Sequence, residues 1–296
     1  MTMMNTSDLV EPSGKRRRKM VGATEKFLTV LLLILIAIII LTPLAWLVST
    51  ALKEQKQIFT YPPEWIPNPA VWSNFPDSTT VYPFIRYATN TTIIAGLNIA
   101  GVLITASMAA YAFARLQFPG RDLIFMILLS TLMLPFTVLM IPRYIQFREL
   151  GWIDSWLPLI VPNWFGGGVF FIFLLRQFFR TIPRDLSDAA KLDGASEFRI
   201  FWQIVLPLSK PALAVVAVFV FLDTWNDFLA PLIYITSPEK YTVSLGLSQF
   251  LGNYTSQYAY LMAASTMMIL SSASLITVSM RSARPSFRYC LIREWR

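Results

Sequence analysis

Six long apolar stretches, separated by polar segments, dominate the chain. A bilayer core about 30 Å thick takes roughly 20 residues of helix, and each stretch meets or approaches that length. A backbone in lipid must satisfy its own hydrogen bonds, so each stretch is expected to be a helix. The pattern predicts an all-α, polytopic membrane protein with six transmembrane helices, at Phe27–Val48, Thr91–Phe113, Leu123–Ile141, Leu157–Leu175, Pro211–Ala230 and Tyr258–Met280.

The composition supports this class and excludes several others. Hydrophobic residues make up 55% of the 296 positions and charged residues 14%, against about 25% charged in ordinary soluble domains. The sequence has no histidine and a single cysteine, Cys290. This excludes histidine-based proton relays, histidine-ligated metals, Ser-His or Cys-His catalysis and an internal disulfide. We therefore expect no catalytic site, no metal site and no cofactor bound by this chain.

Lysine and arginine are distributed unevenly between the loops. With the N-terminus inside and six spans, 19 of the 25 fall in inside segments and 6 in outside segments. Positive charge accumulates on the cytoplasmic side of membrane proteins, so both termini are predicted to be cytoplasmic and the net charge of +8 requires no nucleic acid. The predicted layout is a basic tail at residues 1–26, a membrane domain at 27–280 and a basic tail at 281–296. The basic run before the first stretch would also fit a signal peptide, but that stretch is longer than a signal core, which favours a retained anchor.

A 34-residue inside loop, Gln177–Lys210, separates the fourth and fifth stretches. Pro183 can start a helix, Gly194 can end it in a left-handed turn, and Ser196 can cap a second helix. The second helix carries an apolar face at helical spacing, formed by Phe198, Phe201, Trp202 and Val205. The pattern predicts a cytoplasmic helix–turn–helix. Its apolar face either packs under its own bundle or docks onto a soluble partner, and periodicity does not decide between the two.

The fifth stretch contains a group of polar side chains. Asp223 and Asp227 are four residues apart, on one helix face, with Asn226 beside them. Charged groups inside a bilayer are costly, so they usually face protein or a water-filled cavity. Carboxylates, amides and a flat aromatic such as Trp225 commonly hold sugars. The group therefore lies either on a translocation path or at the outer interface, where Trp225 would be an anchor.

Other polar positions lie in or beside the second and fourth stretches. Asn90 and Asn98 are expected to form hydrogen bonds between helices. Asn163 and the three glycines at 166–168 interrupt the fourth stretch. Three glycines allow either local unwinding or close packing of a neighbouring helix, and packing is the favoured interpretation.

The inside loop also contains a longer motif. Asp188-Ala189-Ala190-x-x-Asp193-Gly194-Ala195, followed by Phe201, Ile204, Leu206-Pro207 and Pro211, resembles the EAA signature of ABC-importer permeases, with Asp188 where that family usually has Glu. Two other segments are similar to the carbohydrate branch of this family: Tyr111–Leu116 with Phe118–Gly120, and Thr224–Phe228. The resemblance extends from about Phe27 to about Leu270.

This resemblance implies a type I importer in a bacterial inner membrane, with residues 181–211 as the loop that couples to an ATPase. The implied partners are a second permease, two ATP-binding cassette ATPase subunits, an extracytoplasmic solute-binding protein and membrane lipid. ATP and magnesium would be used by the partner subunits, because the chain has no G-x-x-x-x-G-K-[ST]. The implied coupling residues are Asp188, Ala189, Ala190, Asp193, Gly194, Ala195, Phe201, Ile204, Leu206 and Pro207. The expected substrate path comprises Asp223, Trp225, Asn226, Asp227 and Asn163.

Two other functions fit parts of the sequence. An ion-gradient-driven transporter would be expected to show repeated halves; none is found, and the helix–turn–helix would have no role. A non-transporting membrane scaffold would use the loop but leave the polar group of the fifth stretch unexplained.

The C-terminal part departs from the family pattern. After Leu270, four serines dilute the sixth stretch and a basic tail follows. Natural divergence or a changed reading frame would each produce this. Serine can form hydrogen bonds with its own helix, so the span can survive.

Overall fold

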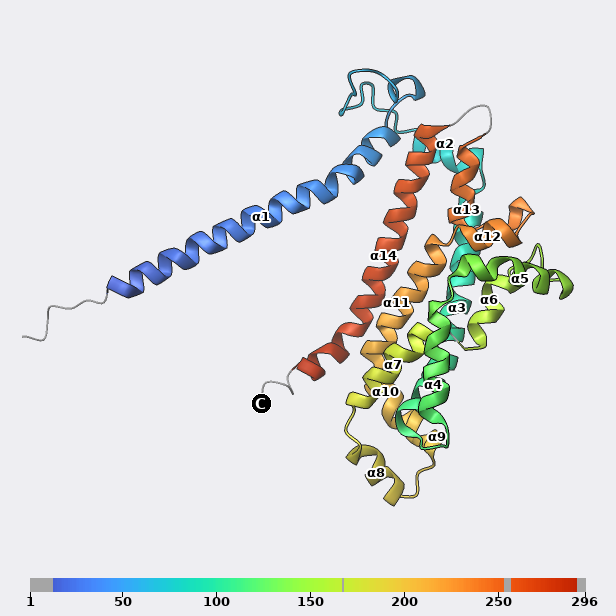
Figure 1. The fold of residues 1–296 in the computed structure, drawn as a ribbon. Coiled ribbons are helices and arrows are strands. Elements are labelled where there is room, and N and C mark those ends of the chain that lie inside the picture. The colour runs from blue at the N-terminus through green and yellow to red at the C-terminus, as the bar shows by residue number, and fades with distance from the viewer. Residues whose placement is uncertain (1–12, 167, 253–256, 292–296) are drawn as a thin grey trace, which may run out of the picture.

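The computed structural model describes residues 13–166, 168–252 and 257–291, and this part of the chain forms helices and connecting segments without a sheet. The all-α prediction is confirmed for these residues. Most of the long helices lie side by side in a bundle, with α8 at one end and α2 at the other (Figure 1). The helices are α1 (Ser13–Ala51), α2 (Asn74–Val81), α3 (Phe84–Arg115), α4 (Arg121–Ser130), α5 (Phe136–Glu149), α6 (Leu157–Trp164), α7 (Val169–Thr181), α8 (Asp185–Leu192), α9 (Glu197–Ile200), α10 (Leu206–Leu208), α11 (Lys210–Asn226), α12 (Leu229–Tyr234), α13 (Val243–Leu247) and α14 (Tyr258–Leu291).

Helix α3 is the centre of the packing. It contacts α6, α7 and α11, and α11 contacts α14 in turn. Ala106 and Ala110, one turn apart on α3, are both fully buried. Small residues at this spacing let neighbouring helices approach closely, which is how membrane helices gain van der Waals contact. The same core includes Leu175 and Phe179 of α7 and Val216 of α11.

Three helical segments are long and apolar enough to cross a membrane: Glu25–Ala51, Phe84–Arg115 and Leu157–Thr181. Two bent pairs bring the number to five among the described residues, if each pair is one span: Arg121–Met133 with Phe136–Glu149, and Glu197–Leu208 with Lys210–Asn226. These segments contain four of the six predicted stretches and most of a fifth, Pro211–Ala230.

The third stretch, Leu123–Ile141, is not the straight helix that its hydropathy predicts. Its two halves meet at 98°, and the break falls at Leu134, whose ψ of 111° is extended. A proline disfavours the helical conformation of the residue before it, and Pro135 stands there. The prediction of one continuous helix here is wrong.

The fourth and fifth stretches are also divided. In the fourth, α6 ends at Trp164 and α7 begins at Val169, with Gly166 and Gly168 at φ values of 121° and 81°, which only glycine adopts readily. Local unwinding, the less favoured of the two interpretations, is therefore observed at Gly166 and Gly168, and residue 167 lies outside the described residues. In the fifth stretch, α11 ends at Asn226, four residues before the predicted end, and the Asp227 carboxylate after it accepts a hydrogen bond from the backbone N–H of Ala230, at 3.2 Å, in the first turn of α12.

The two ends of the chain are more helical than predicted. Helix α1 begins at Ser13, inside the predicted tail, and α14 continues past Met280 to Leu291. Ser271, Ser272 and Ser274 each donate a hydrogen bond to a carbonyl three residues earlier, as expected of serines in an apolar helix. Residues 292–296 of the predicted C-terminal tail lie outside the described residues.

Helix α1 diverges from the bundle along most of its length (Figure 1). Its large apolar side chains from Phe27 to Leu44 are 41–67% exposed. Near its end, the Lys53 ammonium lies 4.0 Å from the centroid of the Trp46 ring, and Trp46 packs edge-on against Trp65. The apolar length of α1 thus requires a cover that the described residues do not supply.

An aspartate connects two loops at the end of the bundle opposite α8. Asp154, after α5, accepts hydrogen bonds from Lys240 Nζ at 2.8 Å and from the hydroxyl and N–H of Ser237 at 2.6 and 2.8 Å. These donors, Lys240 foremost, hold the pKa of Asp154 far below its usual range. Asn90 strengthens this end, since its amide donates to the carbonyls of Glu239 and Tyr241; both partners lie in the segment between α12 and α13, so the contact joins α3 to a loop and not, as predicted, to another helix of the bundle.

Candidate functional site

The predicted helix–turn–helix is present, and Gly194 forms its turn. Gly194 has φ +79°, and it follows the end of α8 directly. Its N–H donates to the carbonyl of Lys191 at 3.0 Å, and the N–H of Ala195 donates to the carbonyl of Ala190 at 2.9 Å. This pair of bonds is a Schellman motif, which ends a helix with a left-handed residue. Ser196 then caps α9 by accepting a bond from the N–H of Arg199, as predicted.

The apolar face of the second helix is divided between two environments. Phe201 and Val205 are 4% and 0% exposed and belong to the core around α3. Phe198 and Trp202 are 66% and 59% exposed, and their rings stack at 6.4 Å. The two alternatives for this face therefore apply to different residues: Phe201 and Val205 pack under their own bundle, and Phe198 and Trp202 remain exposed. This apolar face lies at the edge of the bundle, so half of its side chains pack on their own chain and half are uncovered.

The turn after Phe201 is wider than an α-helix. Residues Phe201–Val205 form a π-helical turn, in which the N–H of Leu206 donates to the carbonyl of Phe201. Pro207 has no N–H to continue the α-helical pattern, so the ladder is disrupted before it. Ser209 restores contact with the preceding turn through its hydroxyl, 2.7 Å from the carbonyl of Val205.

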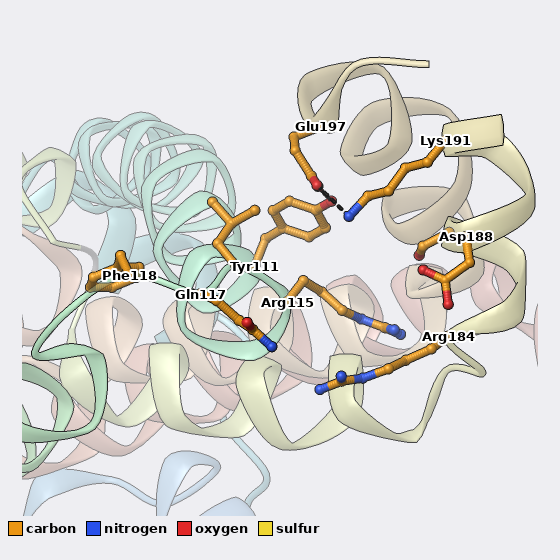
Figure 2. A pocket seen from close by; sticks show the side chains of 10 residues that line it. Tyr111, Arg115, Gln117, Phe118, Arg184, Asp188, Lys191 and Glu197 are labelled. Carbon is orange, nitrogen blue, oxygen red and sulfur yellow. Dashed lines mark hydrogen bonds and ion pairs between the residues drawn. The ribbon is translucent and has the colours of Figure 1, made fainter. Parts of the chain in front are cut away.

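Polar contacts fix the loop to the end of α3. Tyr111 donates a hydrogen bond to Glu197 at 2.6 Å, and Lys191 forms an ion pair with the same carboxylate at 2.6 Å (Figure 2). Burial alone would raise the pKa of Glu197, but the bonds from Lys191 and Tyr111 together lower it. Arg115, the last residue of α3, donates to carbonyls at the end of α7 at 2.8 and 2.5 Å. Sequence reasoning missed the Tyr111–Glu197 pair, because the two residues are far apart in the chain.

The predicted coupling residues divide into an inner and an outer group. Phe201 is buried, and four others pack partly buried against the same core: Ala190, Ala195, Ile204 and Leu206. Asp188, Ala189, Asp193, Gly194 and Pro207 are exposed. The exposed surface of the loop also carries large apolar side chains, namely Leu186, Leu192, Phe198 and Trp202.

A second candidate site is a polar cavity of about 150 Å³ between α3, α6 and α11. Three of the predicted path residues line it: Asn163, Asp223 and Asp227. Asn98 and Thr224 lie on its wall, and the Asn98 amide donates to the Thr224 hydroxyl at 3.2 Å, which confirms the predicted role of Asn98 between helices. The buried carboxamide oxygen of Asn98 has no partner among the described residues.

The remaining two predicted path residues do not line this cavity. Trp225 is 2% exposed and stacks on Phe221, 5.1 Å away, in a separate core with Tyr87. Asn226 is exposed and donates to the carbonyl of Leu222 at 2.8 Å. Trp225, two positions after Asp223, points to another side of the helix, and Asn226, although three positions after Asp223, is not among the lining residues; a role for the two in the path stays a prediction.

A bundle of apolar helices with a polar cavity between spans, and an anchored helix–turn–helix at one end, defines a membrane transport subunit. A family model described as "Binding-protein-dependent transport system inner membrane component" matches residues 101–285. The chain belongs to this family, and it is a permease subunit of an ABC transporter.

Individual relatives agree with this assignment. The chain is 32% identical over 235 residues to the diacetylchitobiose uptake system permease protein NgcG of Streptomyces coelicolor, covering 79% of this chain and 78% of the relative. It is 31% identical to the sn-glycerol-3-phosphate transport system permease protein UgpE of Yersinia enterocolitica, covering 84% and 91%. It is 35% identical to the arabinooligosaccharides transport system permease protein AraQ of Bacillus subtilis, covering 63% and 66%.

The fold also matches a solved structure. A chain of a bacterial ABC transporter involved in the import of the acidic polysaccharide alginate aligns with a TM-score of 0.74, at 22% identity, covering 92% of this chain and 98% of that chain. At this identity the likeness concerns the fold. Because the relatives are ABC transporter permeases, the ABC permease is favoured over the two alternatives, a gradient-driven transporter and a non-transporting scaffold.

Proposed function

We propose that residues 181–211 are the coupling loop and that an ATPase subunit docks on their outer surface. The carrying observation is that the loop is packed against the bundle on one side and uncovered on the other. Its inner side chains pack on the core around α3 and are tied to Tyr111, whereas Leu192 and Trp202 are 91% and 59% exposed. Large exposed apolar side chains grouped on one surface mark an interaction site.

Substitution of Trp202 tests this docking. Trp202→Ala removes an exposed ring without disturbing the core, and a central interface aromatic typically contributes about 2 kcal/mol or more to binding. We expect co-purification of the ATPase from membranes in mild detergent to fall by about tenfold or more. Trp72→Ala is the matched control, because Trp72 is 69% exposed and lies before α2, at the other end of the bundle.

Either of two outcomes contradicts the docking proposal. Equal recovery of the ATPase from wild type and Trp202→Ala would remove Trp202 from the interface. Equal loss from Trp202→Ala and Trp72→Ala would indicate a general effect of losing an exposed tryptophan. ATP and magnesium belong to the partner ATPase subunits in this proposal; ATP binding to those subunits moves the docked loop, and hydrolysis resets it.

We infer that the polar cavity between α3, α6 and α11 is this subunit's part of a translocation path for a neutral sugar or sugar derivative. Its wall combines carboxyl, amide and hydroxyl groups with the ring of Phe171, which suits a polyhydroxylated solute. Among the described lining residues there is no cation to balance Asp223 and Asp227. Two unbalanced carboxyl groups disfavour an anionic solute.

Transport by the reconstituted complex, with its solute-binding protein, tests the path. Asp223→Asn keeps the shape of the side chain and removes its charge; loss of one charge-assisted hydrogen bond, about 1.5–3 kcal/mol, should lower uptake by about tenfold or more. Asn226→Ala, on the same helix but outside the cavity, separates the cavity from the wider predicted path: normal uptake confines the path to the cavity, and reduced uptake extends it to Asn226. Diacetylchitobiose and an arabino-oligosaccharide serve as neutral probes and sn-glycerol-3-phosphate as the anionic one. Preferred uptake of the phosphate ester would contradict the neutral-sugar proposal.

The same family assignment supports the full arrangement that we propose. The proposed six-span topology uses α14 as the sixth span and places both termini in the cytoplasm. A second permease and membrane lipid cover the exposed length of α1, and an extracytoplasmic solute-binding protein delivers solute to the end that carries α2. Cysteine accessibility on each side of intact membranes tests the topology, and cytoplasmic inaccessibility of the α8 loop would contradict it.

A further inference from the structure

A cavity of about 560 Å³ lies between the end of α3 and α8, and three cationic side chains line it. Lys191 is paired with Glu197, but Arg184 makes no ion pair within the described part of the chain. Arg115 uses one terminal nitrogen on two backbone carbonyls, whereas its Nε is buried without a partner among the described residues. The side-chain ends of Arg115, Arg184 and Gln117 approach the same space (Figure 2).

A buried hydroxyl faces the same cavity. Ser187 is 8% exposed and lines the cavity, and its Oγ has no hydrogen-bond partner among the described residues. Buried donors without acceptors are destabilising, so a ligand that brings acceptors is favoured. Neither Ser187 nor Arg184 belongs to the proposed contacts of the coupling surface, and the cavity has no other function assigned above.

We propose that this cavity binds one phosphate group, held by Arg115, Arg184 and Ser187. These donors come from α3 and α8 and approach from different directions, which matches a tetrahedral group with several acceptor oxygens better than a planar carboxylate. Arginine is well suited to phosphate because its guanidinium presents several N–H groups in a fixed plane.

The carboxylates on the cavity wall modulate this site. Glu197 accepts bonds from Lys191 and Tyr111, so its charge is compensated. Asp188 lines the cavity and has no ion pair among the described residues, so it opposes a bound anion. With three cations and two carboxylates, the lining keeps an excess of one positive charge, and replacing Asp188 by a neutral residue should strengthen phosphate binding.

The phosphate has two possible sources with the same chemistry. Arg115 is the last residue of a candidate membrane-spanning helix, where an anionic phospholipid can place its headgroup. Soluble phosphate reaches the same space from the aqueous side. In both cases the ligand would bridge α3 and α8, and so would hold the loop against the end of the span.

Hydrogen exchange at the α8 amides tests the site, using the full-length chain with its co-purifying subunits in nanodiscs. One arm adds inorganic phosphate to phosphatidylcholine nanodiscs, and the other uses phosphatidylglycerol without free phosphate. We expect several-fold slower exchange across Asp185–Leu192 in at least one arm. Arg184→Gln and Ser187→Ala should abolish the slowing, and Asp188→Asn should increase it. Arg180→Gln is the control, since Arg180 is exposed at the end of α7 and outside the cavity.

The two arms identify the source of the ligand. Slowing with phosphatidylglycerol alone assigns the site to a lipid headgroup, and slowing with inorganic phosphate alone assigns it to a soluble phosphate. No slowing in either arm, or equal slowing in wild type and Arg184→Gln, overturns the proposal. Exchange in α8 is measured without ATP hydrolysis, so this result is separate from the co-purification that tests ATPase docking.

Discussion

Replacing Gly194 tests the coupling loop through its backbone alone. A Cβ at Gly194 would meet no atom within 4 Å, so alanine introduces no clash. The cost comes from φ +79°, a left-handed conformation that disfavours an L-residue by about 1–2 kcal/mol. That free energy corresponds to a roughly 5–30-fold change in the population of the closed turn. Asparagine tolerates this conformation better, so Gly194→Asn should have a smaller effect.

Gly151 provides a matched control at the other end of the bundle. It has φ +69°, and a Cβ there would also meet nothing within 4 Å. Its surroundings are the same motif, since Gly151 donates to Arg148 at 3.0 Å and Trp152 donates to Phe147 at 2.8 Å. Gly151→Ala should therefore carry the same backbone cost in a different loop.

Two measurements separate local strain from lost coupling. Hydrogen exchange of the amides that close each turn should accelerate about 5–30-fold in the corresponding alanine variant. Recovery of the ATPase and ATP-driven uptake should fall in Gly194→Ala but stay at the wild-type level in Gly151→Ala. If exchange accelerates in Gly194→Ala while uptake and ATPase recovery remain normal, the loop does not couple. If exchange does not accelerate, the backbone argument is wrong.

Two further predictions concern stability. A Cβ on Gly101 would lie 2.7 Å from the Trp164 ring, whereas one on Gly96 would meet nothing within 4 Å. Gly101→Ala should therefore lower the free energy of unfolding by about 1–3 kcal/mol, and Gly96→Ala should not. Thermal unfolding of both variants in detergent checks this. The lowered pKa of Asp154 stabilises the fold above the usual aspartate pKa of about 3.9, and this contribution is lost as pH falls below it. The wild-type Tm should therefore decrease in that range more steeply than the Tm of Asp154→Asn, in which Lys240 loses its ion-pair partner at every pH, and parallel profiles would contradict this.

Local features of the fold could be predicted from the sequence where one residue type determines the backbone. Gly194 and Ser196 mark the turn and the cap, because few other residues stabilise those conformations. The positions of the main helices follow from hydropathy in the same way. The bend at Pro135 was missed because apolar residues continue on both sides of it. Hydropathy predicts which residues lie in lipid, but it does not predict the direction of the helix axis.

The candidate sites were predictable only in part, since they depend on contacts between distant segments. The spacing of Asp223 and Asp227 placed both on one face, and both line the polar cavity. Trp225 lies between these two aspartates in the sequence, but its side chain is buried in another core with Tyr87, against which Phe221 packs. The helical spacing of apolar residues likewise predicts which side chains share a face, but it does not predict what covers that face. The different environments of Phe201 and Trp202 could therefore not be predicted.

Helix α3 connects the two sites. Its 32 residues span about 48 Å at 1.5 Å per residue. Near one end, Tyr111 and Arg115 hold the loop and the end of α7; near the middle, Asn98 forms a hydrogen bond with Thr224 at the wall of the cavity. Gly101 lets the Trp164 ring pack directly on the same helix. If an ATPase moves the loop as proposed, an unbroken, half-buried helix with polar contacts at both places transmits that movement to the cavity better than the bent and interrupted helices around it. Coupling therefore depends on the contacts that α3 makes within the chain as well as on the exposed side chains that meet the partner.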